Sequence, residues 1–135
     1  MIHSGLALQS SLFVLLNENG PLIDRLGSTA IYDHVPTEAA PPYITFGEAT
    51  YFDWGTGTEA GTEHAITLNV WSAHDGRKEV LQIAGLVEQA MQSAPHELDG
   101  HVLVNLTHES TEVSRDVEAD LFLARINLRA VTEPN

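Results

Sequence analysis

The residues of this chain that could carry chemistry are its seven histidines and 19 carboxylates, because the sequence contains no cysteine. Imidazole and carboxylate groups bind zinc, manganese and iron. From Pro95 to His101 a glutamate and two histidines come close together, in an order that looks like the HExxH motif of zinc proteases. That motif needs histidines four positions apart on one helical face, whereas His96 and His101 are five apart and Gly100 separates them. We therefore predict a turn here and expect no bound metal.

The other histidines and the serines indicate no catalytic arrangement. His64 and His74 bracket a predicted strand, and we expect them to be polar residues at its rim. His108 alternates in phase with Val104 and Leu106, which predicts a partly buried, hydrogen-bonded imidazole. The sequence has no GxSxG pattern that would place a nucleophilic serine at a strained turn.

Phosphate binding and acid–base catalysis are weakly indicated as well. Residues 55–58 are rich in glycine but lack the GKS or GKT ending of a P-loop, and Glu59 and Glu63 would repel phosphate. Glu118 and Asp120 fall in a predicted turn between strands, where solvated charge is the ordinary interpretation. We therefore expect no catalytic residue, no cofactor and no enzymatic activity. A small histidine-dependent metal enzyme is the less favoured alternative.

The formal net charge of −13 argues against nucleic-acid binding. Nineteen acidic residues stand against six basic ones, which are scattered along the sequence and form no basic patch. An acidic surface can serve solubility, which we favour, or line a channel through which DNA passes without sticking. No apolar run approaches the roughly 20 residues that span a bilayer. The N-terminus also lacks a basic segment followed by an apolar one, so we expect a soluble, unexported protein.

Three segments have helical patterns. In residues 4–18 apolar side chains recur at helical spacing, namely Leu6, Leu8, Leu12, Phe13, Leu15 and Leu16. Residues 21–26 predict a short helical turn that begins with proline and ends at Gly27. The clearest pattern is an apolar stripe formed by Val80, Ile83, Ala84, Val87 and Met91. We expect Asp75 or Gly76 to cap the helix that carries this stripe.

Alternating apolar residues predict an antiparallel sheet. The predicted strands occupy residues 30–33, 43–51, 64–72, 101–109 and 121–131, and the long ones have one apolar and one mostly polar face. This pattern is typical of a sheet covered by helices on one side only. The expected fold is therefore α+β, a single domain over residues 1–135 whose antiparallel sheet has two helices packed on one face. The polar, glycine-rich segment 52–62 predicts a mobile hairpin loop.

Residues 31–72 contain a distinctive succession of short motifs: IYDHVP, PPYITFGEAT, YFDWGTGT and HAITLNVWS. In order and spacing they resemble the tail terminators, or tail completion proteins, of long-tailed phages and gene transfer agents. Weaker similarity extends over nearly the whole chain. The matching residues are Ile31, Tyr32, Asp33, Val35, Pro36, Pro42, Tyr43, Ile44, Gly47, Glu48, Asp53, Trp54, His64, Thr67, Leu68, Val70, Trp71 and Ser72.

The resemblance implies a structural virion protein. Tail terminators form a ring, expected here to be hexameric, on the head-proximal end of the tail tube, where they stop tube polymerisation and provide the joint to the head. The implied partners are further copies of the chain, the tail tube protein and a head-side connector or stopper protein. DNA passes through the ring without specific binding, no membrane takes part, and assembly occurs in the bacterial cytoplasm. The alternative within this class is a head-side connector or adaptor subunit of the neck.

Candidate interface residues come from three places. Aromatic residues entering a polar loop anchor interfaces in many proteins, but they can also pin the base of a hairpin, and both interpretations stay open. Arginines on the outer sheet face can pair with carboxylates of neighbouring copies. An Arg-Asp pair precedes the last strand in related sequences, where a tight turn follows it. The candidates are Tyr51, Phe52, Asp53, Trp54, Trp71, Arg115, Asp116, Arg125 and Arg129.

Overall fold

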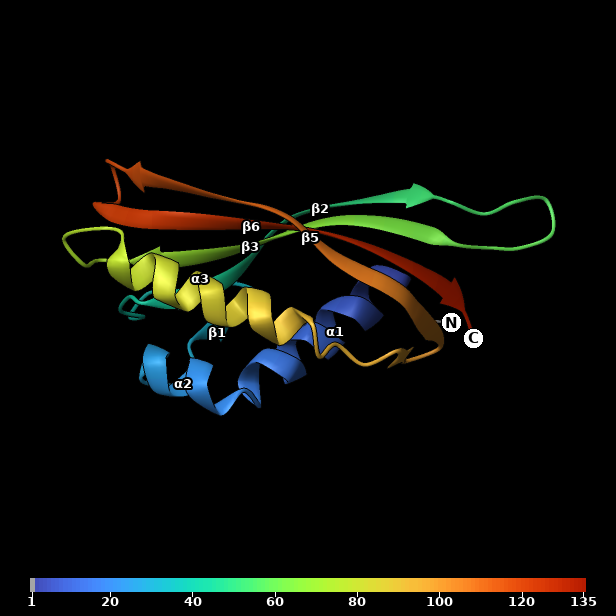
Figure 1. The fold of residues 1–135 in the computed structure, drawn as a ribbon, viewed down its shortest axis with the longest axis horizontal. Coiled ribbons are helices and arrows are strands. Elements are labelled where there is room, and N and C mark those ends of the chain that lie inside the picture. Colours follow the sequence, from blue (N-terminus) through green and yellow to red (C-terminus); the bar gives the residue numbers. More distant parts are fainter. Residues whose placement is uncertain (1) are drawn as a thin grey trace.

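A six-stranded sheet forms the centre of the computed structural model, which describes residues 2–135 (Figure 1). The strand order is β1-β2-β3-β6-β5-β4, and every pairing is antiparallel except that of β1 with β2. The strands are β1 (Ile31–Tyr32), β2 (Tyr43–Asp53), β3 (Thr62–Ser72), β4 (Glu97–Leu98), β5 (His101–Asp116) and β6 (Leu121–Pro134). The predicted antiparallel sheet is confirmed, although β5 extends well beyond residue 109.

Three helices cover one face of the sheet (Figure 1). The helices α1 (Ser4–Asn17) and α3 (Lys78–Met91) pack against strands, and α2 (Gly20–Leu26) packs on the other two helices. The Asn19 side chain caps α2 by accepting a 3.0 Å hydrogen bond from the backbone N–H of Leu22. Gly27 ends it with a φ of 84°, a left-handed conformation that glycine adopts without strain. The predicted one-sided α+β fold is confirmed, with the short segment as its third helix.

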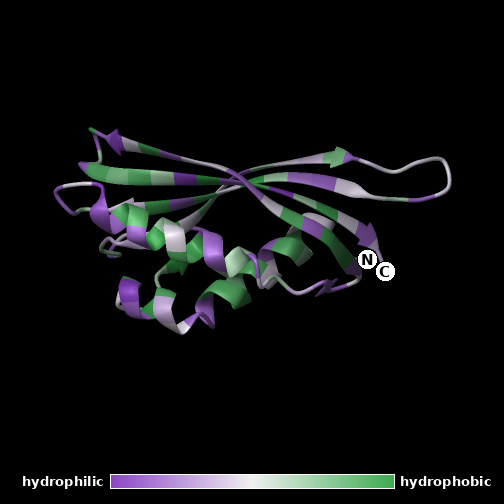
Figure 2. Ribbon diagram, in the orientation of Figure 1, coloured by the Kyte–Doolittle hydropathy of each residue, from purple (hydrophilic) through white to green (hydrophobic). Residues whose placement is uncertain are grey.

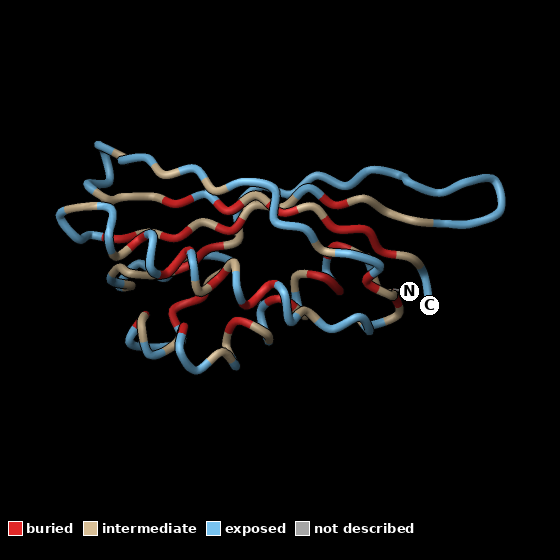
Figure 3. The backbone as a smooth tube through the Cα atoms, in the orientation of Figure 1, coloured by how far each residue is buried: buried red, intermediate tan, exposed pale blue. Residues whose placement is uncertain are grey.

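The helices and the covered sheet face meet in one apolar core (Figures 2 and 3). All five residues of the predicted stripe on α3 are buried. They face sheet residues that include Leu68 and Val70 of β3 and Ile126 and Leu128 of β6. No helix within residues 2–135 combines the length and the apolar character that crossing a membrane would require.

A β-bulge changes which side chains of β5 enter the core. Leu103 pairs with Thr132 and Asn105 with Val131, so that Val104 is an extra residue between them. Leu103 is buried and Leu106 packs against the same core, while Val104 is exposed, although strict alternation would place Val104 and Leu106 on one face. Sequence period alone does not reveal the bulge, because three consecutive apolar residues, 102–104, precede Asn105 and fit either face.

The turn between β5 and β6 forms without glycine. Asp120 takes the position that needs a left-handed backbone, with a φ of 57°. Aspartate tolerates this conformation better than most residues. The Arg115 guanidinium forms an ion pair with the Asp120 carboxylate, and the Asp116 carboxylate accepts a hydrogen bond from the backbone N–H of Ala119. The predicted turn at Glu118 and Asp120 is confirmed.

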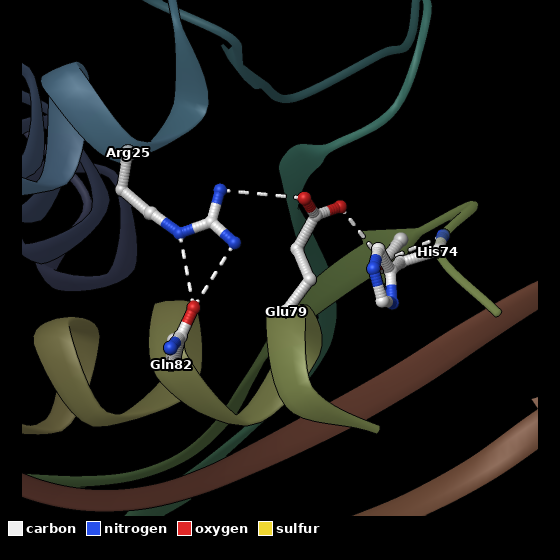
Figure 4. Close-up of polar contacts among 5 residues, drawn as sticks. Arg25, His74, Glu79 and Gln82 are labelled. Carbon is white, nitrogen blue, oxygen red and sulfur yellow. Dashed lines mark hydrogen bonds and ion pairs between the residues drawn. The ribbon is translucent and has the colours of Figure 1, made fainter. Parts of the chain in front are cut away.

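The start of α3 is held by a polar network instead of the expected cap (Figure 4). Arg77 occupies the N-cap position and makes no capping hydrogen bond, so the prediction of Asp75 or Gly76 was wrong. Glu79 in the first turn accepts a 2.8 Å hydrogen bond from the buried Ser72 hydroxyl and a 3.3 Å hydrogen bond from Arg25. A carboxylate there also faces the positive end of the helix dipole. This network joins β3, α3 and α2.

Replacing Glu79 with alanine should lower the free energy of unfolding by about 1–3 kcal/mol, because the buried Ser72 hydroxyl loses its acceptor. Chemical denaturation of wild type and variant measures the difference. The matched control is Glu79→Gln, whose amide oxygen can still accept from Ser72 and which should cost less. Equal losses in the two variants would contradict this role for the hydrogen bond.

Candidate functional site

The histidines of the chain do not converge on a metal site. Within residues 2–135 no group of three or more histidine, aspartate or glutamate side chains is arranged to hold a metal ion. The segment 95–101 forms β4 and a turn in which Gly100 has a φ of 73°, as predicted. The His96 imidazole donates a 3.2 Å hydrogen bond to the carbonyl of Leu103, and His101 donates a 2.8 Å one to the carbonyl of Ile2. Both side chains thus fasten backbone segments.

His64 is a core residue and not the rim residue that the sequence predicted. Its side chain lies on the covered sheet face, where the Tyr51 ring packs edge-on 5.3 Å away. Its Nε2 lies 2.9 Å from the Thr132 hydroxyl. Burial, together with smaller repulsive contributions from His3 and His101, lowers the pKa of His64 to about 4. A neutral imidazole at this position supports the fold around the N-terminus.

His74 and His108 both lie at the surface. His74 contributes its backbone N–H to the Ser72 hydroxyl at 3.1 Å, and its ring makes no bond in the network of Figure 4. His108 is hydrogen-bonded as predicted, with its Nε2 2.7 Å from the Thr111 hydroxyl. It is exposed, however, whereas the sequence predicted partial burial. It lies next to the second bulge of β5, which interrupts the alternation used to place it.

The outer sheet face carries a polar layer that the helices leave open. Trp71 and Arg125 both lie there, as predicted, and the Trp71 indole donates a 3.1 Å hydrogen bond to the Thr45 hydroxyl. Asn127 accepts from Thr67 and donates to Glu112, each at 3.0 Å. The result is a hydrogen-bonded polar surface that needs no cover from its own chain.

Two of the three candidate arginines form ion pairs within the chain. Arg129 forms an ion pair with Glu63 on the neighbouring strand, a bond that raises the guanidinium pKa. Arg115 pairs with Asp120 and lies over the Phe122 ring, 5.4 Å from its centre. Within the described residues no carboxylate forms an ion pair with Arg125, which lines a shallow hollow on the outer face. Arg125 is therefore the candidate arginine best placed to meet another molecule.

Arg115 and Asp116 do not join the other candidates in one site. They belong to the β5–β6 turn, which lies at the opposite end of the molecule from the β2–β3 hairpin (Figure 1). Both side chains are engaged in that turn. The structure thus distributes the predicted interface residues over the hairpin, the outer sheet face and this turn.

The hairpin between β2 and β3 divides its aromatic residues between two roles. The Tyr51 ring rests on Gly5 of α1 and beside His3 and His64, so it pins the hairpin base. Phe52 and Trp54 are 50% and 51% exposed, and within residues 2–135 neither of them pairs with another aromatic ring. The Asp53 carboxylate accepts a 2.9 Å hydrogen bond from the backbone N–H of Gly55 and shapes the start of the loop. Of the two interpretations left open by the sequence, Tyr51 fits the pinning of the hairpin base, whereas the exposure of Phe52 and Trp54 is compatible with an interface.

The helix α1 has exposed as well as buried apolar residues. Leu8, Leu12 and Leu16 are fully buried, whereas Leu6 and Phe13 are 54% and 41% exposed. The signal was present in the sequence, because apolar residues occur on both faces of this helix and only one face can meet the sheet.

The fold defines a class, small α+β domains with helices on one face of a mostly antiparallel sheet. Residues 11–133 match the family described as "Tail completion protein gp17", and the chain belongs to this family. It is therefore a structural tail completion protein, which confirms the resemblance noted in the sequence.

Two solved structures are similar over most of their length. A chain of the "Virion of native gene transfer agent (GTA) particle" is 26% identical, with a TM-score of 0.90; the match covers 98% of this chain and 99% of that one. The bacteriophage SPP1 gp17 protein is 21% identical and has a TM-score of 0.59, with 98% and 91% of the two chains covered. The SPP1 protein shares the fold. No curated protein sequence matches the chain.

Acidification should destabilise the protein through His64. Its pKa is 6.5 in the unfolded chain and about 4 in the folded one, so its contribution is complete above pH 6.5 and is lost as the pH falls towards 4. The loss should reach up to about 3 kcal/mol. Urea unfolding at a series of pH values measures it, with His64→Gln as the control that removes this titration. Parallel pH profiles for the two proteins would contradict the assignment.

Proposed function

We propose that this protein is a tail terminator. Six copies close into a ring on the head-proximal end of the tail tube, stop tube polymerisation and provide the joint to the head. The partners are further copies of the chain, the tail tube protein and a head-side connector or stopper protein. DNA passes through the open ring, and the single domain acts through its surfaces without a cofactor.

The observation that carries this proposal is the similarity to a gene transfer agent virion protein over nearly the full length of both chains. A TM-score of 0.90 at 26% identity means that the same elements occur in the same arrangement. Membership in the tail completion family supports a structural role in the tail. The described residues form one fold, and the role is proposed to depend on its surfaces.

The distribution of open surfaces suits a closed ring. A ring needs a head-to-tail contact between two different patches of each copy. The hairpin and the β5–β6 turn lie at opposite ends of the molecule, and the outer sheet face lies between them (Figure 1). The hairpin, whose loop spans residues 54–61, is proposed to be mobile until it meets its partner. Its exposed aromatic residues then become buried.

Charge also fits a channel for DNA. Six copies carry six times −13, a formal charge of −78. Like charge keeps the DNA phosphates from adhering to the wall of the ring. Repulsion between copies is limited, because the screening length is about 8 Å at physiological salt.

The purified protein should form rings with sixfold symmetry and an open centre. Electron micrographs show the symmetry, and native mass spectrometry at tens of micromolar should give a mass six times that of the chain. Co-purification with tail tube protein supports a terminator, whereas co-purification with portal or adaptor protein alone supports a neck subunit. If the protein stays monomeric even in the presence of tail tubes, the proposal is overturned.

Replacing both Phe52 and Trp54 with alanine should weaken assembly while leaving the fold near wild-type stability, because both side chains are half exposed. Analytical ultracentrifugation measures assembly and thermal denaturation measures stability. Leu81→Ala is the matched control, since this exposed apolar residue on α3 lies outside the hairpin, the outer sheet face and the β5–β6 turn. If the double variant unfolds, the two aromatics belong to the core and the interface assignment is wrong.

A further inference from the structure

The helix α1 differs from the rest of this acidic chain in having no charge. The first 17 residues contain no aspartate, glutamate, lysine or arginine, and this is the longest such run in the sequence. A surface built from α1 is therefore the place where another acidic protein can approach at the least electrostatic cost.

The exposed arc of α1 is apolar. Leu6, Phe13 and Val14 are 54%, 41% and 51% exposed, and they fall at positions i, i+7 and i+8, with Ser10 between them at i+4. Residues at these spacings lie on one side of a helix. We call these four residues the α1 stripe. The opposite side of the helix is already buried under the sheet.

A helix that is apolar on both sides is normally covered on both sides. Within the described chain, the other exposed large apolar residues outside the hairpin are isolated: Leu81 on α3, Val104 at the β5 bulge and Val117 in a turn. The α1 stripe and the hairpin are thus the two clustered apolar surfaces of the molecule. A head-to-tail contact needs two different surfaces of this kind.

The hairpin suits the α1 stripe in charge as well as in polarity. Phe52 and Trp54 are accompanied by the carboxylates of Asp53 and Glu59, so their docking surface must be free of acidic groups. The hairpin does not cover the stripe of its own chain. It meets its own α1 through Tyr51 on Gly5, which is on the buried side of the helix, and it projects past the body of the molecule (Figure 1).

We propose that the α1 stripe of each copy receives Phe52 and Trp54 from the hairpin of the next copy, which makes this contact a repeating interface of the ring. This inference rests on the proposed ring function and adds the two surfaces that close it. The partner is a second copy of this chain, bound head to tail.

Site-directed cross-linking tests the pairing directly, because the natural chain has no cysteine. The double variant Ser10→Cys/Thr58→Cys keeps Phe13, Phe52 and Trp54 and places one thiol in the α1 stripe and one in the hairpin loop. Treated with a short bis-maleimide after assembly, it should give a ladder of covalent multimers on denaturing gels. Each single variant should stay monomeric, since a head-to-tail contact never brings two copies of one position together. Dimers of the Ser10→Cys variant alone would indicate a symmetric contact and overturn the proposal. Assembled rings without a ladder would overturn it too.

A second variant separates the interface from the ring itself. Phe13→Ser should raise the concentration needed for half-assembly by at least about ten-fold, with a circular dichroism spectrum like that of wild type. Leu81→Ser is the matched control, because it removes a similarly exposed apolar side chain outside the stripe. If the wild type assembles and Phe13→Ser assembles equally well, this inference is overturned and the proposed function is not. Failure of the wild type to assemble even on tail tubes overturns the proposed function.

Discussion

Burial of one sheet face beneath α1 and α3 is the interaction on which the rest of this structure depends. It joins strands far apart in the chain into one core and leaves the other sheet face to water. Because all three helices lie on the same side, the molecule has an open sheet face, a projecting hairpin and a helix with an uncovered side (Figures 1 and 3). A more symmetric fold would have hidden the surfaces on which a structural subunit relies.

The charge balance decides what kind of contact those surfaces can make. Three of the six basic side chains, Arg25, Arg115 and Arg129, already pair with carboxylates of the same chain. Few cations remain to neutralise the acidic groups of a neighbour. Association between copies must therefore depend mainly on apolar surfaces where carboxylates are scarce, since the hydrophobic effect is not opposed by like charge there. Arg125 can add an ionic contact at the outer sheet face.

Several polar residues of types that can act in catalysis or bind metals stabilise the fold instead. Glu79 accepts from a buried serine and holds an arginine of another helix, and His101 fastens the N-terminal backbone. His64 illustrates the physical reason: a buried neutral imidazole costs little, whereas its protonated form is disfavoured by burial. Ser72, His74 and Glu79 lie near one another, and their hydrogen bonds hold the end of β3 and the start of α3.

The sequence by itself determined the periodic features, because side-chain periodicity depends only on local backbone geometry. The stripe of α3, the order of the strands along the chain, the turn at residues 117–120 and the family motifs could all be read from it. Only the tertiary structure decided what depends on distant neighbours. The bulge at Val104, the burial of His64, the polar network around Glu79 and the exposure of Phe13 all follow from which elements pack together. The candidate interface residues were partly recognised by type, but their separation into distinct surfaces came from the fold, since spacing along a chain does not fix distance in space.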